Sequence, residues 1–319
     1  MPVQRRQESF FSLALPYRER LVLERAVIAG GAGPRIAIVS GIHGDELEGL
    51  YVCHRLAARL DALLARSPEA LLGTVELYPA LNPLGLDTLE RAVPIYDIDL
   101  NRAFPGQAGG LVPHRLADAV MRQLSGAALV IDIHASNIYL REIPQVRIAR
   151  AFEAGLAPMA RSMNLDLIWV HEASTVLEHT IAHSLNASGT PCLVVEMGVG
   201  MRLTPAFAEQ VTTGILHVAR ALGVLRRDVE LEPIEHRPLV ADDNNVHYLN
   251  AEVSGMFVPS VEHWIAVRRD ELLGRIVSPL MAQTLSEVRS PCDGVLFTLR
   301  EYPLVYEGSL LARLMEVSP

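Results

Sequence analysis

The 319-residue chain contains no lysine, so that its 28 cationic side chains are all arginine. A Schiff base, a phosphate-loop lysine and a covalently attached biotin or lipoyl group each require a lysine side chain. All three kinds of chemistry are therefore excluded. Arginine remains available for fork-like recognition of carboxylates.

Cysteine is scarce as well, and long apolar runs are missing. The three cysteines, Cys53, Cys192 and Cys292, are too far apart for a Cys-x-x-Cys site and too few for a disulfide framework. No run approaches the ~18 apolar residues of a membrane span, and the first residues lack the pattern of a signal peptide. We therefore expect a cytoplasmic protein with no membrane partner.

The chain has fewer basic than acidic side chains, 28 against 37, so its formal net charge at pH 7 is −9. A nucleic-acid-binding protein usually carries a basic patch, so we expect no nucleic-acid partner. Half of the residues are apolar and a fifth are charged, which is typical of a globular protein. A chain of this length favours one large domain plus a small one.

Strand-like and helix-like segments alternate along the first two thirds of the chain. Residues 1–35 read as an opening pair of antiparallel strands that ends in glycines and a proline. Alternation of buried strands with helices predicts an α/β fold with a largely parallel sheet. The remaining predicted strands are 36–39, 74–78, 128–133 and 192–195, and the predicted helices are 47–60, 111–124, 180–187 and 207–225.

A polar, proline-containing stretch then divides the chain. We predict a large domain over residues 1–228, a linker over 229–240 and a small all-β domain over 241–319. Helical periodicity largely disappears after the linker, and short strand-like runs alternate with glycine and proline turns. These runs lie at 265–268, 294–299 and 310–314.

Two apolar strands are followed by metal-binding side chains. SGIHGDELEG places His43 and Glu46 three residues apart at the predicted start of a helix, where i and i+3 share a face. IDIHAS delivers His134 to the same rim, because ligands gather at the carboxyl ends of the strands of an α/β sheet. Two histidines and a glutamate are a ligand set of catalytic zinc. A histidine near a helix start is more often a cap or a surface residue, but the flanking glycines favour access.

The segment YDIDLNRAFPG contains a crowded set of polar side chains between two prolines. We predict a rigid loop here and not a helix. Arg102 with the adjacent amide of Asn101 suits a substrate carboxylate, and Asp99 could orient a metal-bound imidazole. The alternative is that Arg102 simply pairs with Asp97 or Asp99 as a clamp of the loop.

Glu196 directly follows four apolar strand residues in CLVVEMG. An unpaired carboxylate at the end of a buried strand is costly, so the residue is expected to have a task. A glutamate that faces a metal-activated water would be its general base.

Taken in order, SGIHGDELEG, DLNRAFPG, DIHAS and VVEMG resemble the succinylglutamate desuccinylase/aspartoacylase family, the deacylase branch of the zinc carboxypeptidase-like fold. The resemblance covers nearly the whole chain and implies a three-layer fold with a mixed sheet and a small C-terminal β domain. It also implies one Zn²⁺ per chain. Carried over residue by residue, it implies zinc ligands at His43, Glu46 and His134, carboxylate binding by Asn101 and Arg102, and a general base at Glu196. Arg91 is the nearest candidate for an arginine that polarises the scissile carbonyl.

The resemblance implies zinc-dependent hydrolysis of the amide bond of a small N-acyl amino acid or related N-acyl amine. One alternative inside the same fold is a zinc carboxypeptidase that acts on a small peptide. Another is a non-catalytic metal- or ligand-binding protein, because the last strand-rich segment resembles a lipoyl-like barrel-sandwich domain. The missing lysine argues against a carried group. Homo-oligomeric assembly is left open.

Overall fold

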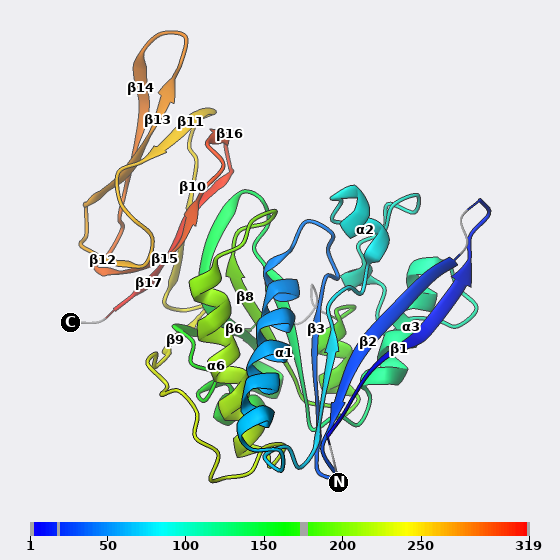
Figure 1. Ribbon diagram of the computed structural model, residues 1–319. Coiled ribbons are helices and arrows are strands. Elements are labelled where there is room, and N and C mark those ends of the chain that lie inside the picture. Colours follow the sequence, from blue (N-terminus) through cyan, green and yellow to red (C-terminus); the bar gives the residue numbers. More distant parts are fainter. Residues whose placement is uncertain (1–2, 18–19, 173–177, 318–319) are drawn as a thin grey trace.

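A computed structural model describes residues 3–17, 20–172 and 178–317. A central β-sheet is covered by helices on both faces, and a strand-rich C-terminal region stands at one end of the sheet (Figure 1). The predicted α/β class with three layers, a mixed sheet and a C-terminal β region is confirmed.

The sheet of the main body begins with an antiparallel hairpin at its edge, which confirms the predicted opening strands. Its next strands, β4, β3, β5 and β8, run parallel to one another, and β6 returns antiparallel to β8. Their spatial order is β1 (Gln4–Ala14), β2 (Arg20–Ala29), β4 (Thr74–Tyr78), β3 (Arg35–Ser40), β5 (Leu129–Ala135), β8 (Cys192–Gly198) and β6 (Leu140–Ala149).

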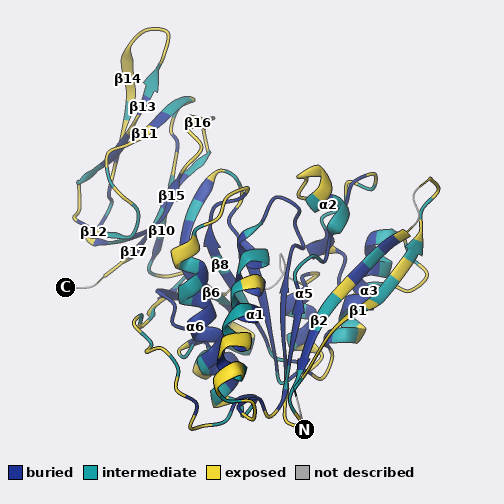
Figure 2. Cartoon of the chain, in the orientation of Figure 1, coloured by how far each residue is buried: buried dark blue, intermediate teal, exposed yellow. Residues whose placement is uncertain are grey.

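Helices cover the sheet because the buried strands are apolar on both faces. In β3, Ile36 and Ile38 join one buried cluster while Ala37 and Val39 join another, since successive strand residues point to opposite faces. Figure 2 shows the sheet buried between the helical layers. None of the described helices combines the length and the apolar character that a membrane crossing needs. The helices that pack on the face of Ile36 and Ile38 are α1 (Glu48–Arg66), α4 (Glu153–Ala160) and α6 (Pro205–Ala221). The helices that pack on the face of Ala37 and Val39 are α3 (Val112–Leu124) and α5 (Ile181–Ala187).

The C-terminal region continues the sheet of the main body. Strand β15 pairs antiparallel with β6, with Thr298 opposite Glu142, and β9 adds to β7. A second sheet of four strands, in the order β14, β13, β11 and β16, encloses a separate apolar cluster with the first. The strands are β7 (Leu167–His171), β9 (Leu239–Asp242), β10 (Val246–Asn250), β11 (Gly255–Pro259), β12 (Ile265–Val267), β13 (Leu272–Ser278), β14 (Gln283–Arg289), β15 (Gly294–Arg300), β16 (Leu304–Val305) and β17 (Leu310–Glu316).

The boundaries at 1–228, 229–240 and 241–319 remain a prediction. Strand β9 already begins inside the predicted linker, and β15 joins the two regions through backbone hydrogen bonds. The elements of the main body that were not expected from the sequence include β6, β7, α4 and the short helix α2 (Pro83–Thr88). Both β6 and α4 contain a proline, Pro144 and Pro158, which argues against a regular element in a sequence.

Candidate active site

His43 and Glu46 lie in the turn between β3 and α1, since the helix begins only at Glu48. The prediction that this pair shares a helix face is therefore wrong. Gly44 holds the turn, because its backbone N–H donates to the Glu90 carbonyl at 3.0 Å. A Cβ at Gly44 would lie 2.0 Å from the carbonyl carbon of Gly85, so only glycine permits this close approach.

His134 comes from the end of β5, next to the strand that carries Glu196. The two strands are parallel and in register, with His134 directly opposite Glu196. Asp132 lies two residues before His134, so its side chain points to the same face of the sheet. The parallel register thus brings three polar side chains to the carboxyl edge of the sheet.

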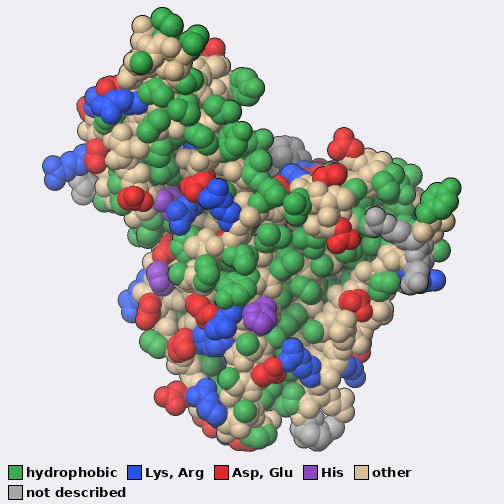
Figure 3. Space-filling view, turned by 45° about the horizontal axis from the view of Figure 1, so that its top comes forward, with side chains coloured by type: hydrophobic (Ala, Val, Ile, Leu, Met, Phe, Trp, Pro, Cys, Tyr) green, Lys and Arg blue, Asp and Glu red, His purple; other side chains and the backbone are tan. Residues whose placement is uncertain are grey.

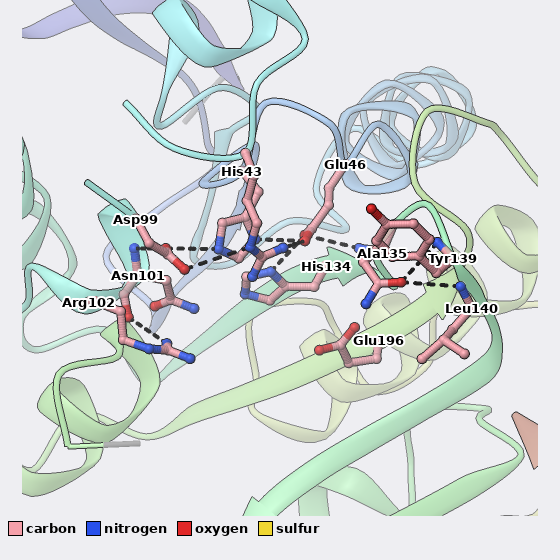
Figure 4. Close-up of polar contacts among 12 residues, drawn as sticks. His43, Glu46, Asp99, Asn101, Arg102, His134, Ala135, Tyr139, Leu140 and Glu196 are labelled. Carbon is pink, nitrogen blue, oxygen red and sulfur yellow. Dashed lines mark hydrogen bonds and ion pairs between the residues drawn. The ribbon is translucent and has the colours of Figure 1, made fainter. Parts of the chain in front are cut away.

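His43, Glu46 and His134 converge on one buried point (Figure 4). The Nδ1 atom of His43 lies 2.7 Å from Glu46 Oε1, and the Nδ1 atom of His134 lies 2.8 Å from Glu46 Oε2. One ligand atom from each of the three side chains falls within 4.8 Å of the other two. The structure therefore brings together the three side chains that the sequence suggested as metal ligands.

Two further carboxylates fix the outer nitrogens of these imidazoles. His43 Nε2 lies 3.1 Å from Asp99 Oδ1, and His134 Nε2 lies 2.9 Å from Asp132 Oδ2. Such carboxylate partners set the tautomer and the orientation of metal-ligating histidines. Asp99 was suggested by the sequence. Asp132 was missed, although its i, i+2 spacing from His134 on a strand was a usable signal.

The donor set fits a divalent cation. Burial opposes the charge of the His43 imidazole, but the Glu46 carboxylate raises its pKa. Burial likewise opposes the charge of His134, and Asp132 and Glu46 raise its pKa. Buried positive charge is thus favoured at this point. A metal ion would replace the protons on the inward nitrogens, which are the Nδ1 atoms of His43 and His134 that face Glu46. Two nitrogens and one carboxylate are ligands that zinc accepts.

Arg91, Asn101 and Arg102 lie around the same cluster. Arg91 Nη1 donates to Glu46 Oε1 at 2.9 Å, and its side chain is 44% exposed. Asn101 Oδ1 accepts from the Ile181 backbone N–H at 3.0 Å, which fixes the amide. Arg102 Nη1 donates to the backbone carbonyl of Asn101 at 2.9 Å, and within the described part of the chain no ion pair joins it to a carboxylate.

The loop that carries Asn101 and Arg102 was predicted to lack helix. It contains one turn of 3₁₀-helix over Leu100–Arg102, so the prediction was wrong for this short stretch. Asp99 caps the turn, because its side chain accepts from the Asn101 backbone N–H at 2.8 Å. This capping bond makes the turn possible between two prolines.

A cavity of about 650 Å³ opens beside the cluster. Glu196 lines it together with Arg91, Asn101 and Arg102. In Figure 4, Glu196 lies on the other side of His134 from Asn101 and Arg102. Figure 3 turns the carboxyl-end rim of the sheet forward and shows charged side chains of both signs among apolar ones.

Glu196 is partly buried at the wall of this cavity, with 15% of its side chain exposed. Burial raises the pKa of Glu196 above its ordinary value, while Arg147, whose Nη1 lies 3.2 Å from Glu196 Oε1, opposes the shift. A carboxylate with a raised pKa is better suited to accept a proton near neutral pH. Arg147 was not suggested by the sequence.

Comparisons with known proteins agree with this architecture. The family model of the succinylglutamate desuccinylase/aspartoacylase catalytic domain matches residues 32–222. The N-alpha-acetyl-L-2,4-diaminobutyric acid deacetylase of Halomonas elongata is 25% identical over 308 residues, which cover 91% of this chain and 84% of that protein.

Solved structures extend the likeness in fold to the whole chain. The product-bound ectoine utilization protein EutE (DoeB) from Ruegeria pomeroyi has a TM-score of 0.81 at 23% identity and covers 99% of both chains. A succinylglutamate desuccinylase from Silicibacter sp. TM1040 has a TM-score of 0.83 at 22% identity, covering 99% of this chain and 95% of that one. The C-terminal region is therefore part of the shared fold.

Proposed function

The chain belongs to the succinylglutamate desuccinylase/aspartoacylase family, and we propose that it is a zinc-dependent deacylase that hydrolyses the amide bond of a small N-acyl amino acid or related N-acyl amine. The observation that carries this proposal is the convergence of His43, Glu46 and His134 beside a cavity that also contains Glu196. The cavity volume of about 650 Å³ suits a small molecule.

One zinc ion per chain would be held by His43, Glu46 and His134. When bound, the ion supplies Lewis acidity for the amide carbonyl and for the attacking water. Asp99 and Asp132 hold the two imidazoles so that the inward nitrogens face Glu46. This leaves the ligands preorganised before any ion arrives.

Glu196 is proposed as the general base that takes a proton from the attacking water and passes it to the leaving amine. Its partial burial and its place at the cavity wall support this role. Arg91 is proposed to donate a hydrogen bond to the carbonyl oxygen as negative charge develops there. Its partly exposed side chain at the cavity favours such a contact.

Asn101 and Arg102 are proposed to bind a carboxylate on the amine portion of the substrate. The side-chain oxygen of Asn101 accepts a hydrogen bond from the Ile181 backbone N–H, so the side-chain NH₂ group remains to donate to the substrate. Arg102 carries a guanidinium at the cavity without a carboxylate partner among the described residues. A substrate carboxylate would supply that partner.

The proposal is tested with a panel of N-acetyl and N-succinyl amino acids and matched dipeptides, with release of a primary amine as the measurement. We expect hydrolysis of N-acyl amino acids, loss of activity on chelation and recovery on addition of zinc. Cleavage of the dipeptides alone would favour a carboxypeptidase. Neither zinc nor hydrolysis in the purified protein would favour a non-catalytic binding protein.

Arg102→Lys is expected to raise KM for N-acyl amino acids by about 10-fold or more, since lysine offers a point charge where a fork is needed. The measurement is kcat and KM on each acid and on its neutral amide. The amides should be poor substrates of both proteins and should respond little to the substitution. An equal KM for acids and amides in the unsubstituted protein would contradict the role of Arg102.

A further inference from the structure

Glu196 is fixed on one side by an arginine of the neighbouring strand. Arg147 Nη1 lies 3.2 Å from Glu196 Oε1, and Arg147 belongs to β6, which pairs with β8. Both side chains line the cavity. The position of the Glu196 carboxylate therefore depends on what holds Arg147.

Arg147 is itself held by a buried carboxylate and by an aromatic face. Its Nη2 donates to Glu142 Oε1 at 3.0 Å, and its guanidinium lies 5.4 Å from the centre of the Trp169 ring. Glu142 is almost wholly buried, with 1% of its side chain exposed. A buried carboxylate is costly unless it is paired, so Glu142 strongly requires its partners.

Besides Gln145, whose side-chain amide donates to Glu142 Oε2, the partners of Glu142 include two side chains of the C-terminal region. Arg313 of β17 donates from Nη1 to Glu142 Oε1 at 2.7 Å, and its guanidinium also lies 5.4 Å from the centre of the Trp169 ring. Thr298 of β15 donates to Glu142 Oε2 at 2.9 Å. Two strands beyond the predicted linker thus reach the carboxylate that anchors Arg147.

The four side chains of Arg147, Arg313, Glu142 and Glu196 form a chain of ion pairs with balanced charge. Arg147 and Arg313 carry two positive charges, and Glu142 and Glu196 carry two negative ones. Without Arg313, Arg147 would be the one arginine paired with both carboxylates. Arg147 would then pair with Glu142 and move away from Glu196. Glu142 is more deeply buried than Glu196, and charge pairing is stronger away from water.

We propose that Arg313 is a positioning residue for Glu196, acting through Glu142 and Arg147, so that β17 of the C-terminal region completes the active site. This inference rests on the proposed function in one respect, namely that Glu196 acts as the base. It assigns the C-terminal region a part in turnover.

The test compares Arg313→Met with the control variant Arg289→Met. Arg289 lies in the same region, and its guanidinium donates to Glu287 and to the Asp270 backbone carbonyl. For Arg313→Met we expect kcat to fall about 10-fold, with KM within about 2-fold and zinc content unchanged, as for loss of a partner that orients a catalytic group. Arg289→Met should match the unsubstituted protein. Arg313→Lys, which keeps the charge, should recover part of kcat.

A second variant keeps the test sharp if Arg313→Met folds poorly. In Glu142→Gln/Arg313→Met the neutral amide no longer competes for Arg147, so kcat should return to within about 3-fold of the starting value. An unchanged kcat in folded, zinc-loaded Arg313→Met would overturn the proposal. So would a kcat in the double variant that stays as low as in Arg313→Met.

A crystal structure of Arg313→Met separates this inference from the proposed function. We expect Arg147 Nη1 to move out of hydrogen-bond distance of Glu196, whether or not a substrate has been found. Arg147 still bonded to Glu196 would refute the positioning role. A protein that shows the displacement but hydrolyses no member of the panel would refute the proposed function alone.

Discussion

His134→Ala is expected to remove the metal and the activity together. The imidazole supplies one of three donor atoms that lie within 4.8 Å of one another, and Glu46 would keep His43 as its one histidine partner among the described residues. Loss of an outer partner already costs metal affinity about 10- to 100-fold, and loss of a ligand should exceed that. Zinc content by elemental analysis and kcat on the best substrate are the two measurements.

His183→Ala is the matched control for zinc content, because His183 lines the same cavity and lies outside the cluster. It should retain about one zinc per chain. If His134→Ala were to retain its full zinc content, His134 would be removed from the proposed ligand set. Asp132→Ala should show an intermediate loss of affinity, since Asp132 only holds the outer nitrogen of His134.

Glu196→Gln is expected to keep the zinc and to lose most of the turnover. The amide preserves the shape of the side chain but cannot accept the proton, and general base catalysis typically contributes about 10²–10⁴-fold. We expect kcat to fall within that range while KM changes little. Zinc content, kcat and KM measured on one preparation separate the two effects.

Glu209→Gln provides the matched change away from the cavity, since Glu209 lies on α6 and pairs with Arg55 and Arg59. Its kcat should equal that of the unsubstituted protein. If Glu196→Gln instead abolishes zinc binding, then Glu196 is a ligand and the proposed assignment of roles is wrong. Wild-type turnover in Glu196→Gln would exclude Glu196 as the base.

The sequence predicts the parallel centre of the fold because local signals suffice there. The apolar run 36–39 lies in a strand that ends at Ser40, and the segment IDIHAS lies at the end of a strand whose second-to-last residue is His134. Since β3, β5 and β8 are parallel, their carboxyl ends meet, and His43, His134 and Glu196 gather at one rim. A glycine-bounded turn after residues 36–39 was expected, but the contacts of Gly44 with Gly85 and Glu90 were not, because those residues lie far along the chain.

Strand β6 could not be predicted, because its polar residues are buried for reasons that lie elsewhere in the chain. Glu142, Gln145 and Arg147 interrupt its apolar pattern, and by themselves they indicate an exposed segment. Glu142 is buried with Thr298 and Arg313 as partners, and both of these lie in the C-terminal region. A local pattern contains no information about partners so distant in sequence.

The separation between Glu142 and its C-terminal partners has a consequence for the order of events during biosynthesis. Thr298 lies 156 residues and Arg313 lies 171 residues after Glu142. In a nascent chain the proposed metal ligands and Glu196 would leave the ribosome well before β15 and β17 do. Pairings of such high contact order form late. Full turnover by the proposed deacylase should therefore arise only after β15 and β17 have left the ribosome and paired with the rest of the sheet.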